Sequence, residues 1–380
     1  MTNSLRCWAE VDLDALRGNL AWIRHRVGPQ VKIMTVVKAD AYGHGLKQIA
    51  ALLMQSGTDI FGVANLSEAR AIRSVGKGWP VLMMGACLPD EVEQAVVEDV
   101  MPTISTLPEA KQFSRAATRL KRQSRIHVKV DTGMGRLGVA PEHARKLIAQ
   151  VNRLPNLKLE GLYTHYSSVE DNADFSRVQR QRFEAVLSEL AREGIHVPLI
   201  HANNSGAIMH EPRTLFDLVR PGLLVYGIVP SGRRRADWTL SNRLRPALSF
   251  RCRVSLVKDI RGGTSLSYGR TFVARRKMRV ATLTAGYGDG YPRVAGNRSK
   301  VLIGGRSCPV LGRVTMDQMI VDVSRVRNVR AGDEAVLIGR QGQDEITASE
   351  VADWCGTVPW EILTGISYRV PRIYRGSQAA

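Results

Sequence analysis

The sequence has few cysteines and no apolar run long enough to cross a membrane. Its five cysteines are scattered among 380 residues, are odd in number and include no CxxC pair. This pattern argues against a disulfide framework and against a structural zinc site, so we expect a metal-free protein of the reducing cytoplasm. A membrane span needs about 20 apolar residues in a row, and no membrane partner is expected. The segment Met1–Trp8 lacks the apolar core of a secretory signal, so none is expected.

Acidic residues are also scarce. The chain has 35 Asp and Glu against 54 Lys and Arg, which gives a formal net charge of +19. A nucleic-acid partner would suit such a balance. The basic residues are spread along the chain, however, with short clusters only at 233–235 and 275–277, and zinc-finger and RNP-like motifs are missing. We therefore expect a solvated basic surface and no nucleic-acid partner. The excess of cations also permits small anionic ligands such as phosphates and carboxylates.

Two nucleotide-binding signatures are absent as well. The chain contains no GxxxxGK[ST] loop, and no glycine-rich dinucleotide fingerprint follows its first apolar strand. A nucleotide-binding fold is therefore a less attractive interpretation.

Eight short apolar runs occur in the first two-thirds of the chain, and stretches with helical apolar spacing separate most of them. The runs are Val31–Val37, Ile60–Ala64, Val81–Met84, Pro102–Ser105, Ile126–Val130, Leu159–Tyr163, Leu199–Ala202 and Leu218–Val225. Eight alternations of strand and helix favour an α/β fold with a closed parallel (β/α)8 barrel of the TIM type. The last unit leaves room for only a short helix over 204–210, so an open doubly wound sheet stays an alternative.

The pattern of apolar runs and turns in the sequence changes after Ala236. Short apolar runs, such as Met278–Leu283 and Lys300–Ile303, alternate there with glycine-rich turns, and one helix is predicted over 348–356. We expect a barrel domain over residues 1–236 and a mostly β domain over residues 237–380. An extended segment within residues 1–11 is expected to pair with the second domain.

Lys38 follows the first predicted barrel strand directly. A lysine at the end of a buried strand is partly desolvated, which lowers its pKa and favours the free amine. Such an amine suits a covalent bond with an aldehyde cofactor. An isolated lysine more often extends to solvent. The neighbouring segment 39–45 places Tyr42 near glycines that permit turns, where its hydroxyl is well placed to reach an anion. This segment favours a cofactor-binding lysine over an exposed one.

Further candidate residues lie at or near the ends of the other predicted strands, where the active sites of barrel enzymes lie. They are Lys129, Asp131 and Arg136 at the end of the fifth strand, His165 at the end of the sixth, Asn203 and Ser205 after the seventh, and Arg220 and Gly222 in the eighth. Arg136 is predicted either to hold a carboxylate bidentately or to pair with Asp131. Backbone N–H groups near Ser205 and Gly222 suit a phosphate. Arg220 has an apolar context and needs partners, of which His165 is a candidate.

The second domain carries tyrosines within glycine-rich turns, at 267–270 and 286–293, and a further polar turn at 315–318. Tyrosines in such turns are ordinarily plain turn residues. Taken alone, these segments do not indicate a function.

Taken together, the segments resemble the alanine racemase family over almost the whole chain and in the family's order. Val36–Gly45 is similar to the cofactor-attachment motif of that family. Further segments resemble its other signatures: 131–138, 267–272, 286–293, 312–318 and 367–372. The resemblance implies a pyridoxal-phosphate-dependent racemase that interconverts L- and D-alanine and supplies D-alanine for peptidoglycan. It also implies a head-to-tail homodimer in which each active site combines one subunit's barrel with the other's β domain.

The resemblance assigns roles to matching positions. Lys38 would hold the cofactor and act as one catalytic base, and Tyr268 of the other subunit would be the opposing base. Lys129 matches a lysine that is often carbamylated. The remaining roles are phosphate binding by Tyr42, Ser205, Gly222 and Tyr368, other cofactor contacts by His165, Asn203, Arg220 and Leu223, and substrate binding by Arg136, Met316, Tyr287 and Asp317.

The chemistry of racemisation agrees with these implied roles. A proton must leave one face of Cα and return to the other, and two opposed bases give a direct route. A free tyrosine has a pKa of about 10, so Tyr268 needs help to act as a base. We expect His165 to link Tyr268 to Arg220, whose positive charge favours the phenolate. Arg220 would face the pyridine nitrogen and leave it unprotonated.

Three rival functions are weighed against this interpretation. A serine or broad-specificity racemase is the closest, because spacing does not measure the volume of a pocket. A barrel-type decarboxylase would bring a Cys-rich C-terminal motif, which the chain lacks. A non-enzymatic cofactor-binding relative would lack the second domain.

The sequence departs from the family pattern at three positions, Asp40, Leu223 and Gly288. None of these departures removes a proposed catalytic group.

Overall fold

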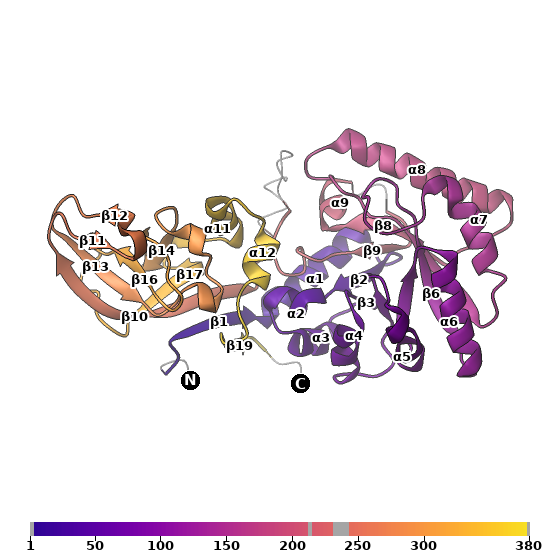
Figure 1. Ribbon diagram of the computed structural model, residues 1–380, viewed down its shortest axis with the longest axis horizontal. Helices are drawn as coiled ribbons and strands as arrows, with labels where there is room; N and C mark the ends of the chain where they lie inside the picture. Colours follow the sequence, from indigo (N-terminus) through magenta and orange to yellow (C-terminus); the bar gives the residue numbers. More distant parts are fainter. Residues whose placement is uncertain (1–3, 212–214, 231–242, 378–380) are drawn as a thin grey trace. The chain divides into compact units, whose positions relative to one another are not determined.

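A computed structural model of the chain describes residues 4–211, 215–230 and 243–377 (Figure 1). The chain divides into two compact units. One comprises residues 15–41 and 46–245, and the other comprises residues 1–14, 42–45 and 246–378. The predicted domain boundary between residues 236 and 237 lies outside the described residues.

Eight parallel strands of the first unit close into a barrel. They are β2 (Lys32–Val36), β3 (Ile60–Val63), β4 (Val81–Met83), β5 (Met101–Ile104), β6 (Ser124–Lys129), β7 (Leu157–Tyr163), β8 (Leu199–Asn204) and β9 (Leu218–Arg220). The last strand returns to the first, with Lys32 opposite Leu218 and Ile33 opposite Val219. This closure confirms the predicted (β/α)8 barrel and rules out the open sheet.

Apolar side chains from six different strands pack together inside this barrel. They are Met34, Ile60, Leu82, Met101, Leu199 and Leu218, each buried. The barrel is therefore a filled core and not a pore, as expected for eight strands. Functional groups are thus confined to the rim.

Helices cover the outside of the barrel (Figure 1). They are α1 (Leu13–Val27), α3 (Leu46–Met54), α4 (Leu66–Arg73), α5 (Val92–Val97), α6 (Leu107–Arg119), α7 (Pro141–Val151), α8 (Ala173–Arg192) and α9 (Ser205–His210). Helix α6 starts at a capping box in which Thr106 and Glu109 satisfy each other's backbone N–H groups. Pro108 and Pro141 lie in first turns, where a missing N–H is harmless.

The predicted eighth strand is too long. It was expected to reach Val225, but β9 ends at Arg220. Pro221 has no N–H to continue the ladder, and the chain then turns, with N–H groups of Val225 and Tyr226 donating to the carbonyls of Gly222 and Leu223 at 2.9 and 3.0 Å. This turn leaves backbone groups at the rim of the barrel.

The short helix α2 (Lys38–Gly43) is left-handed. Ala39, Asp40, Ala41 and Tyr42 have φ between 51° and 54°. An L-residue in this conformation costs about 1–2 kcal/mol. Such strain persists where surrounding contacts fix it, typically at functional sites. One fixing contact comes from Glu68, whose Oε1 accepts a hydrogen bond from the Ala39 N–H at 2.7 Å.

The strain in α2 can be measured with a matched pair of glycine substitutions. Ala39→Gly removes the left-handed penalty at an exposed position, and we expect it to raise the free energy of unfolding by about 0.5–1 kcal/mol. Ala185→Gly, at an exposed position in the right-handed helix α8, should lower it by about 1 kcal/mol. Urea denaturation measures both. Equal losses for the two variants would contradict the left-handed turn.

The second unit is built on a nine-stranded sheet in the order β18-β17-β14-β15-β16-β13-β10-β1-β19. Its strands are β1 (Cys7–Asp12), β10 (Leu248–Ile260), β13 (Met278–Leu283), β14 (Lys300–Ile303), β15 (Arg306–Leu311), β16 (Met319–Asp322), β17 (Glu334–Gln341), β18 (Asp344–Ile346) and β19 (Arg372–Arg375). Strand β1 runs antiparallel to β10 and parallel to β19. The mostly β architecture is the predicted one, although the sequence analysis did not identify β15, β18 or β19.

Shorter elements complete this unit. They are β11 (Ser265–Leu266), β12 (Phe272–Val273), α11 (Ala348–Cys355), α12 (Pro359–Thr364) and the single turns η2 (Tyr268–Arg270), η3 (Tyr287–Asp289) and η4 (Arg293–Ala295). Helix α11 confirms the helix predicted over 348–356 and ends at Gly356, which has a positive φ of 68°. Across the described residues, no helix combines the length and apolar character that a membrane crossing requires.

Candidate active site

Lys38 lies at the carboxyl end of β2, where the chain enters α2. Burial lowers the pKa of its amine, and the positive charge of Arg136 lowers it further, while Glu68 acts in the opposite direction. Glu68 is also bonded to the Ala64 N–H at 2.8 Å. The amine of Lys38 therefore loses its proton more readily than that of an exposed lysine, and the free amine is both a nucleophile and a base.

A second lysine, Lys129, is the last residue of β6, and Arg136 lies in the turn that follows. Burial lowers the pKa of Lys129 to about 8, with further contributions from Arg136 and Arg220. The alternative prediction, a salt bridge between Asp131 and Arg136, is wrong. Instead, Oδ1 of Asp131 accepts three hydrogen bonds of 2.8–3.1 Å from the N–H groups of residues 133–135. Burial alone would raise the pKa of Asp131, but these bonds hold it below its usual range. The carboxylate thus shapes the turn that carries Arg136.

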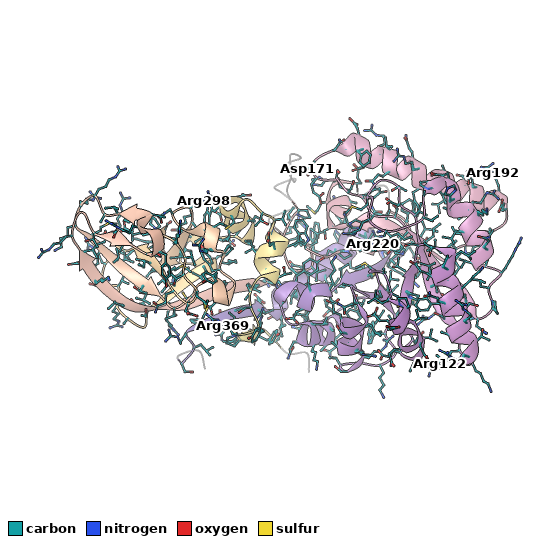
Figure 2. All side chains as sticks on the ribbon, in the orientation of Figure 1. Arg122, Asp171, Arg192, Arg220, Arg298 and Arg369 are labelled. Carbon is teal, nitrogen blue, oxygen red and sulfur yellow. The ribbon has the colours of Figure 1, made fainter. Side chains whose placement is uncertain are left out.

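Arg220 ends β9 and is almost fully buried within the barrel unit (Figure 2). Its guanidinium donates to the carbonyls of Thr164 and Ala202, each at 2.8 Å, and to Nδ1 of His201 at 2.9 Å. The ring of Tyr163 lies 5.2 Å from its Cζ, within the range of a cation–π contact. Burial lowers its pKa to about 10, so Arg220 stays charged at neutral pH.

The contact with Arg220 fixes the tautomers of two buried histidines. Arginine only donates hydrogen bonds, so Nδ1 of His201 accepts and its proton sits on Nε2. That nitrogen lies 2.9 Å from Nδ1 of His127, which accepts in turn. Burial lowers the pKa of both rings, that of His127 to about 3, so both are neutral. The chain Arg220–His201–His127 therefore holds the guanidinium in one orientation.

Gly161 makes room for this histidine chain. A Cβ on Gly161 would lie 2.2 Å from Nδ1 of His127. We expect Gly161→Ala to lower the free energy of unfolding by about 1–3 kcal/mol, because the core has no space to relax. Gly18→Ala is the control, since its Cβ meets no atom within 4 Å in helix α1. In a His127→Ala background, Gly161→Ala should lower the free energy of unfolding by much less. An equally large decrease in that background, measured by denaturation, would contradict the contact between residue 161 and His127.

His165 follows β7 and faces the same guanidinium. Its Nδ1 lies 3.3 Å from Nη2 of Arg220 and can only accept from it. Burial lowers the pKa of His165 well below its ordinary value, and Arg220 and Lys129 add to the effect. The ring is neutral, with its proton on the Nε2 side away from Arg220.

The ends of β8 and β9 form a cradle of polar groups. Asn203 is fully buried, and neither of its side-chain amide atoms has a hydrogen-bond partner among the described residues. The hydroxyl oxygen of Ser205 accepts a hydrogen bond from the Gly222 N–H at 2.9 Å, which leaves its own proton to be donated. Leu223, next in the turn, is buried. Buried amide atoms without partners are rare in native proteins, so the cradle is suited to a ligand.

The predicted residues of the second unit are exposed. Tyr268 is 71% exposed and Tyr368 is 99% exposed, while Tyr287 and Met316 are partly exposed on the same unit. Tyr268 follows Ser267, whose φ of 62° is left-handed and whose hydroxyl donates to the Arg313 carbonyl at 2.6 Å. Large aromatic side chains held on strained turns and directed to solvent are typical of a recognition surface.

Arg369 ties the predicted substrate-binding turns together. Its Nε donates to Asp289 Oδ1 at 2.9 Å, and its Nη2 donates to Asp317 Oδ1 at 2.7 Å. The N–H groups of Tyr287 and Gly288 donate to the carbonyls of residues 315 and 316, at 3.0 and 2.8 Å. The turn at Tyr287 and the turn at Met316 and Asp317 are therefore held side by side.

The predicted site residues fall into two sets. Lys38, Lys129, Arg136, His165, Asn203, Ser205, Arg220, Gly222 and Leu223 belong to the barrel unit, whereas Tyr42, Tyr268, Tyr287, Met316, Asp317 and Tyr368 belong to the other. His127, His201, Tyr163 and Arg369 position these groups and were not predicted from the sequence. Tyr163 and His201 lie at or near the ends of predicted strands, which is the one signal that could have indicated them, whereas His127 lies near the start of its strand.

Comparison of the sequence with known families gives two matches that together span most of the chain. The family model of the alanine racemase N-terminal domain matches residues 11–230, and that of the alanine racemase C-terminal domain matches residues 247–374. An alanine racemase of Carboxydothermus hydrogenoformans is 44% identical over 368 residues, which cover 97% of this chain and 99% of that protein. One of Halothermothrix orenii is 41% identical over 369 residues, or 97% of this chain and 96% of that protein.

Solved structures agree in fold. The alanine racemase of the D-cycloserine producer Streptomyces lavendulae superposes with a TM-score of 0.92 and 34% identity, covering 98% of each chain. The alanine racemase of Bartonella henselae, solved with covalently bound pyridoxal phosphate, has a TM-score of 0.87 and 27% identity, covering 98% of this chain and all of that one.

Proposed function

The chain belongs to the alanine racemase family, and from this premise we propose that it interconverts L- and D-alanine with pyridoxal phosphate attached to Lys38. The observation that carries the proposal is the amine of Lys38, partly buried at the carboxyl end of β2 with a lowered pKa. An unprotonated amine is what attachment of an aldehyde requires.

The residues proposed to hold this cofactor suit its chemistry. The unpartnered amide of buried Asn203 offers a donor and an acceptor to a polar ring substituent. We propose that Tyr42, Ser205, Gly222 and Tyr368 hold the phosphate, with Leu223 beside it, because hydroxyl and backbone N–H groups are its usual donors. Arg220 would face the pyridine nitrogen and, having no proton to accept, leave it unprotonated.

When bound, pyridoxal phosphate delocalises the electron pair left at the substrate Cα and so acidifies its C–H bond. The protein's part is to move the proton. Lys38 Nζ and Tyr268 Oη would work on opposite faces of Cα, and His165, neutral and bonded to Arg220, would orient the phenol. Arg136, the Met316 backbone and Asp317 would receive the substrate carboxylate, and Tyr287 would line the mouth of the site.

We propose a homodimer with shared sites. Support comes from the exposure of Tyr268, Tyr368 and Met316, since a second chain would bury them. Carbamylation of Lys129 is proposed as well. Its pKa of about 8 leaves a usable fraction of free amine, whose nitrogen adds to carbon dioxide with loss of a proton, and the anion formed would orient Arg136.

A visible spectrum tests the proposed function. Purified protein should show the absorbance of lysine-bound pyridoxal phosphate, and borohydride should fix the cofactor to Lys38, which peptide mass mapping locates. Racemisation rates for alanine, serine and lysine then separate an alanine racemase from the broad-specificity alternative. A colourless protein that cofactor does not reconstitute would contradict the proposal.

The cellular role is proposed on chemical grounds. All five cysteines are free thiols, as expected of a protein from a reducing cytoplasm. D-alanine is a peptidoglycan component, and we propose that the enzyme supplies it. Growth of a D-alanine auxotroph on the expressed protein would support this role, and continued dependence on added D-alanine despite measured activity would oppose it.

A further inference from the structure

His127 and His201 are buried titratable side chains to which the proposed function gives no part. Their rings lie within the barrel unit, on β6 and β8, and neither residue has exposed surface. Nδ1 of His127 accepts from Nε2 of His201 at 2.9 Å, so the proton of His127 lies on its own Nε2. That N–H has no acceptor among the described residues. A buried donor without an acceptor is destabilising, so stability alone does not explain an imidazole at position 127.

The guanidinium of Arg220 has only some of its hydrogens left to offer a ligand. Nη2 carries two hydrogens and meets three acceptors, the carbonyls of Thr164 and Ala202 at 2.8 Å and Nδ1 of His165 at 3.3 Å. Nη1 also carries two, and its one hydrogen bond to a described residue goes to Nδ1 of His201 at 2.9 Å. The second Nη1 hydrogen and the Nε hydrogen are therefore available to a ligand. Because the guanidinium is planar, the bond to His201 helps to set the direction of that second Nη1 hydrogen.

Two contacts hold the ring of His201 against Arg220. Its Nε2–H donates to Nδ1 of His127, so the ring is bonded on both sides at once. The ring of Tyr163 stacks on it at a centroid distance of 4.6 Å and an interplanar angle of 7°, which fixes its plane. In a chain of hydrogen bonds each bond polarises the next, so His127 also makes Nδ1 of His201 a stronger acceptor. Without His127, the far side of the His201 ring would lack a partner and its hold on the guanidinium would weaken.

We propose that His127 is a positioning residue for the cofactor, although it touches neither cofactor nor substrate. By holding His201 against Nη1 of Arg220, it aims the second Nη1 hydrogen at the pyridine nitrogen. This role rests on the proposed function, in which Arg220 faces that nitrogen. A ring nitrogen that accepts a hydrogen bond but takes up no proton draws less of the electron pair into the ring. His127 thereby favours racemisation over transamination, in which the proton goes to the cofactor's own carbon instead of Cα and water then releases pyruvate from the aminated cofactor.

A matched pair of substitutions at position 127 tests this role. His127→Asn places Oδ1 where Nδ1 lay and can accept from His201, whereas His127→Leu has the same branching and no acceptor. The leucine variant loses the unmet N–H of residue 127 and leaves one on His201, so the number of unmet buried donors stays the same. Val128→Ala is the control for packing. Val128 is buried on the same strand, and its side chain lies on the opposite face of the barrel wall.

Two measurements read the effect. NMR of the cofactor-free protein with isotope-labelled histidine and arginine locates the His201 proton and follows solvent exchange of the Arg220 hydrogens. We expect the proton on Nε2 in the wild type, and exchange at least about tenfold faster in His127→Leu, since one hydrogen bond to a charged group contributes about that factor. In the holoenzyme, the number of alanine racemisations per pyruvate formed should fall by a similar factor in His127→Leu. Both quantities should stay near the wild-type values in His127→Asn and Val128→Ala.

Each outcome decides the matter. A His201 proton on Nδ1 in the wild type would overturn the proposed chain whether or not any variant folds. Equal changes in His127→Leu and Val128→Ala would show a role in packing only, and failure of His127→Asn to restore the wild-type values would exclude the acceptor. A wild-type protein without cofactor absorbance would overturn the proposed function, whereas a normal spectrum with an unchanged ratio of racemisation to pyruvate in His127→Leu would overturn the positioning role alone.

Discussion

Lys38→Ala is expected to abolish racemisation. Removal of this amine takes away both the proposed attachment point of the cofactor and one of the two proposed bases. A positioned base alone contributes about 10²–10⁴-fold, so we expect turnover to fall by more than about 10⁴-fold. The protein should also lose the visible absorbance of lysine-bound pyridoxal phosphate. Alanine racemisation followed by circular dichroism measures the first effect, and the absorbance spectrum measures the second.

The control for this variant is Lys32→Ala. Lys32 begins the same strand, β2, at the opposite end of the barrel and is exposed. We expect unchanged absorbance and turnover within about twofold, as for surface substitutions in general. A Lys38→Ala protein that still racemises alanine at a measurable fraction of the wild-type rate would refute the assigned base.

Tyr268→Phe is expected to reduce racemisation by about 10²–10⁴-fold while cofactor binding is retained. The phenol is one base of the proposed pair, and its loss leaves Lys38 alone. Lys38 should still exchange the Cα hydrogen of one enantiomer with deuterated solvent, without inversion. NMR in D₂O measures this exchange for each enantiomer. Equal exchange of both enantiomers, or near-normal racemisation, would show that Tyr268 is not the second base.

Mixing the two inactive variants tests whether sites are shared between chains. In a heterodimer of Lys38→Ala and Tyr268→Phe subunits, one site receives both intact residues and the other receives neither. Random reassortment makes about half of the dimers mixed, so about a quarter of wild-type activity should return if the interface is symmetric. Sites formed within one chain would give no recovery. Mixing Lys38→Ala with itself is the matched negative control.

The barrel and the β domain could be predicted from the sequence, and the proposal for Lys38 came from the same source. These features rest on local patterns. A short continuous apolar run followed by helical apolar spacing can be recognised within about 20 residues of sequence, and the active-site residues of a barrel lie at the strand ends. The attachment segment 36–45 was visible for the same reason. Local reasoning failed where one residue changed the outcome, as at Pro221, which ended the eighth strand five residues before the predicted end at Val225.

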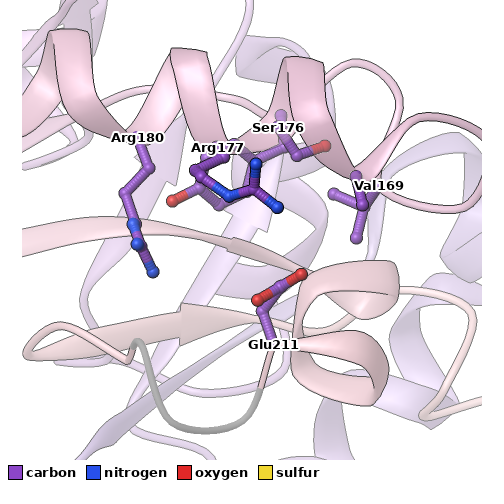
Figure 3. Close-up of a pocket in the computed structure, with 7 residues that line it drawn as sticks. Val169, Ser176, Arg177, Arg180 and Glu211 are labelled. Atoms are coloured by element: carbon purple, nitrogen blue, oxygen red, sulfur yellow. The ribbon is translucent and has the colours of Figure 1, made fainter.

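Which side chains come into contact depends on the packing of the folded chain. His127, His201 and Arg220 lie on three different strands, and their contacts depend on the register with which the barrel closes. The left-handed turn at Ala39 likewise runs against the preference of its own residues and needs Glu68 to fix it. A small cavity lined by residues of α8 and by Glu211, which follows α9, likewise forms between segments far apart in the sequence (Figure 3). Such features arise from packing between segments that are far apart in the sequence. A local sequence pattern does not indicate how close two such segments lie in space.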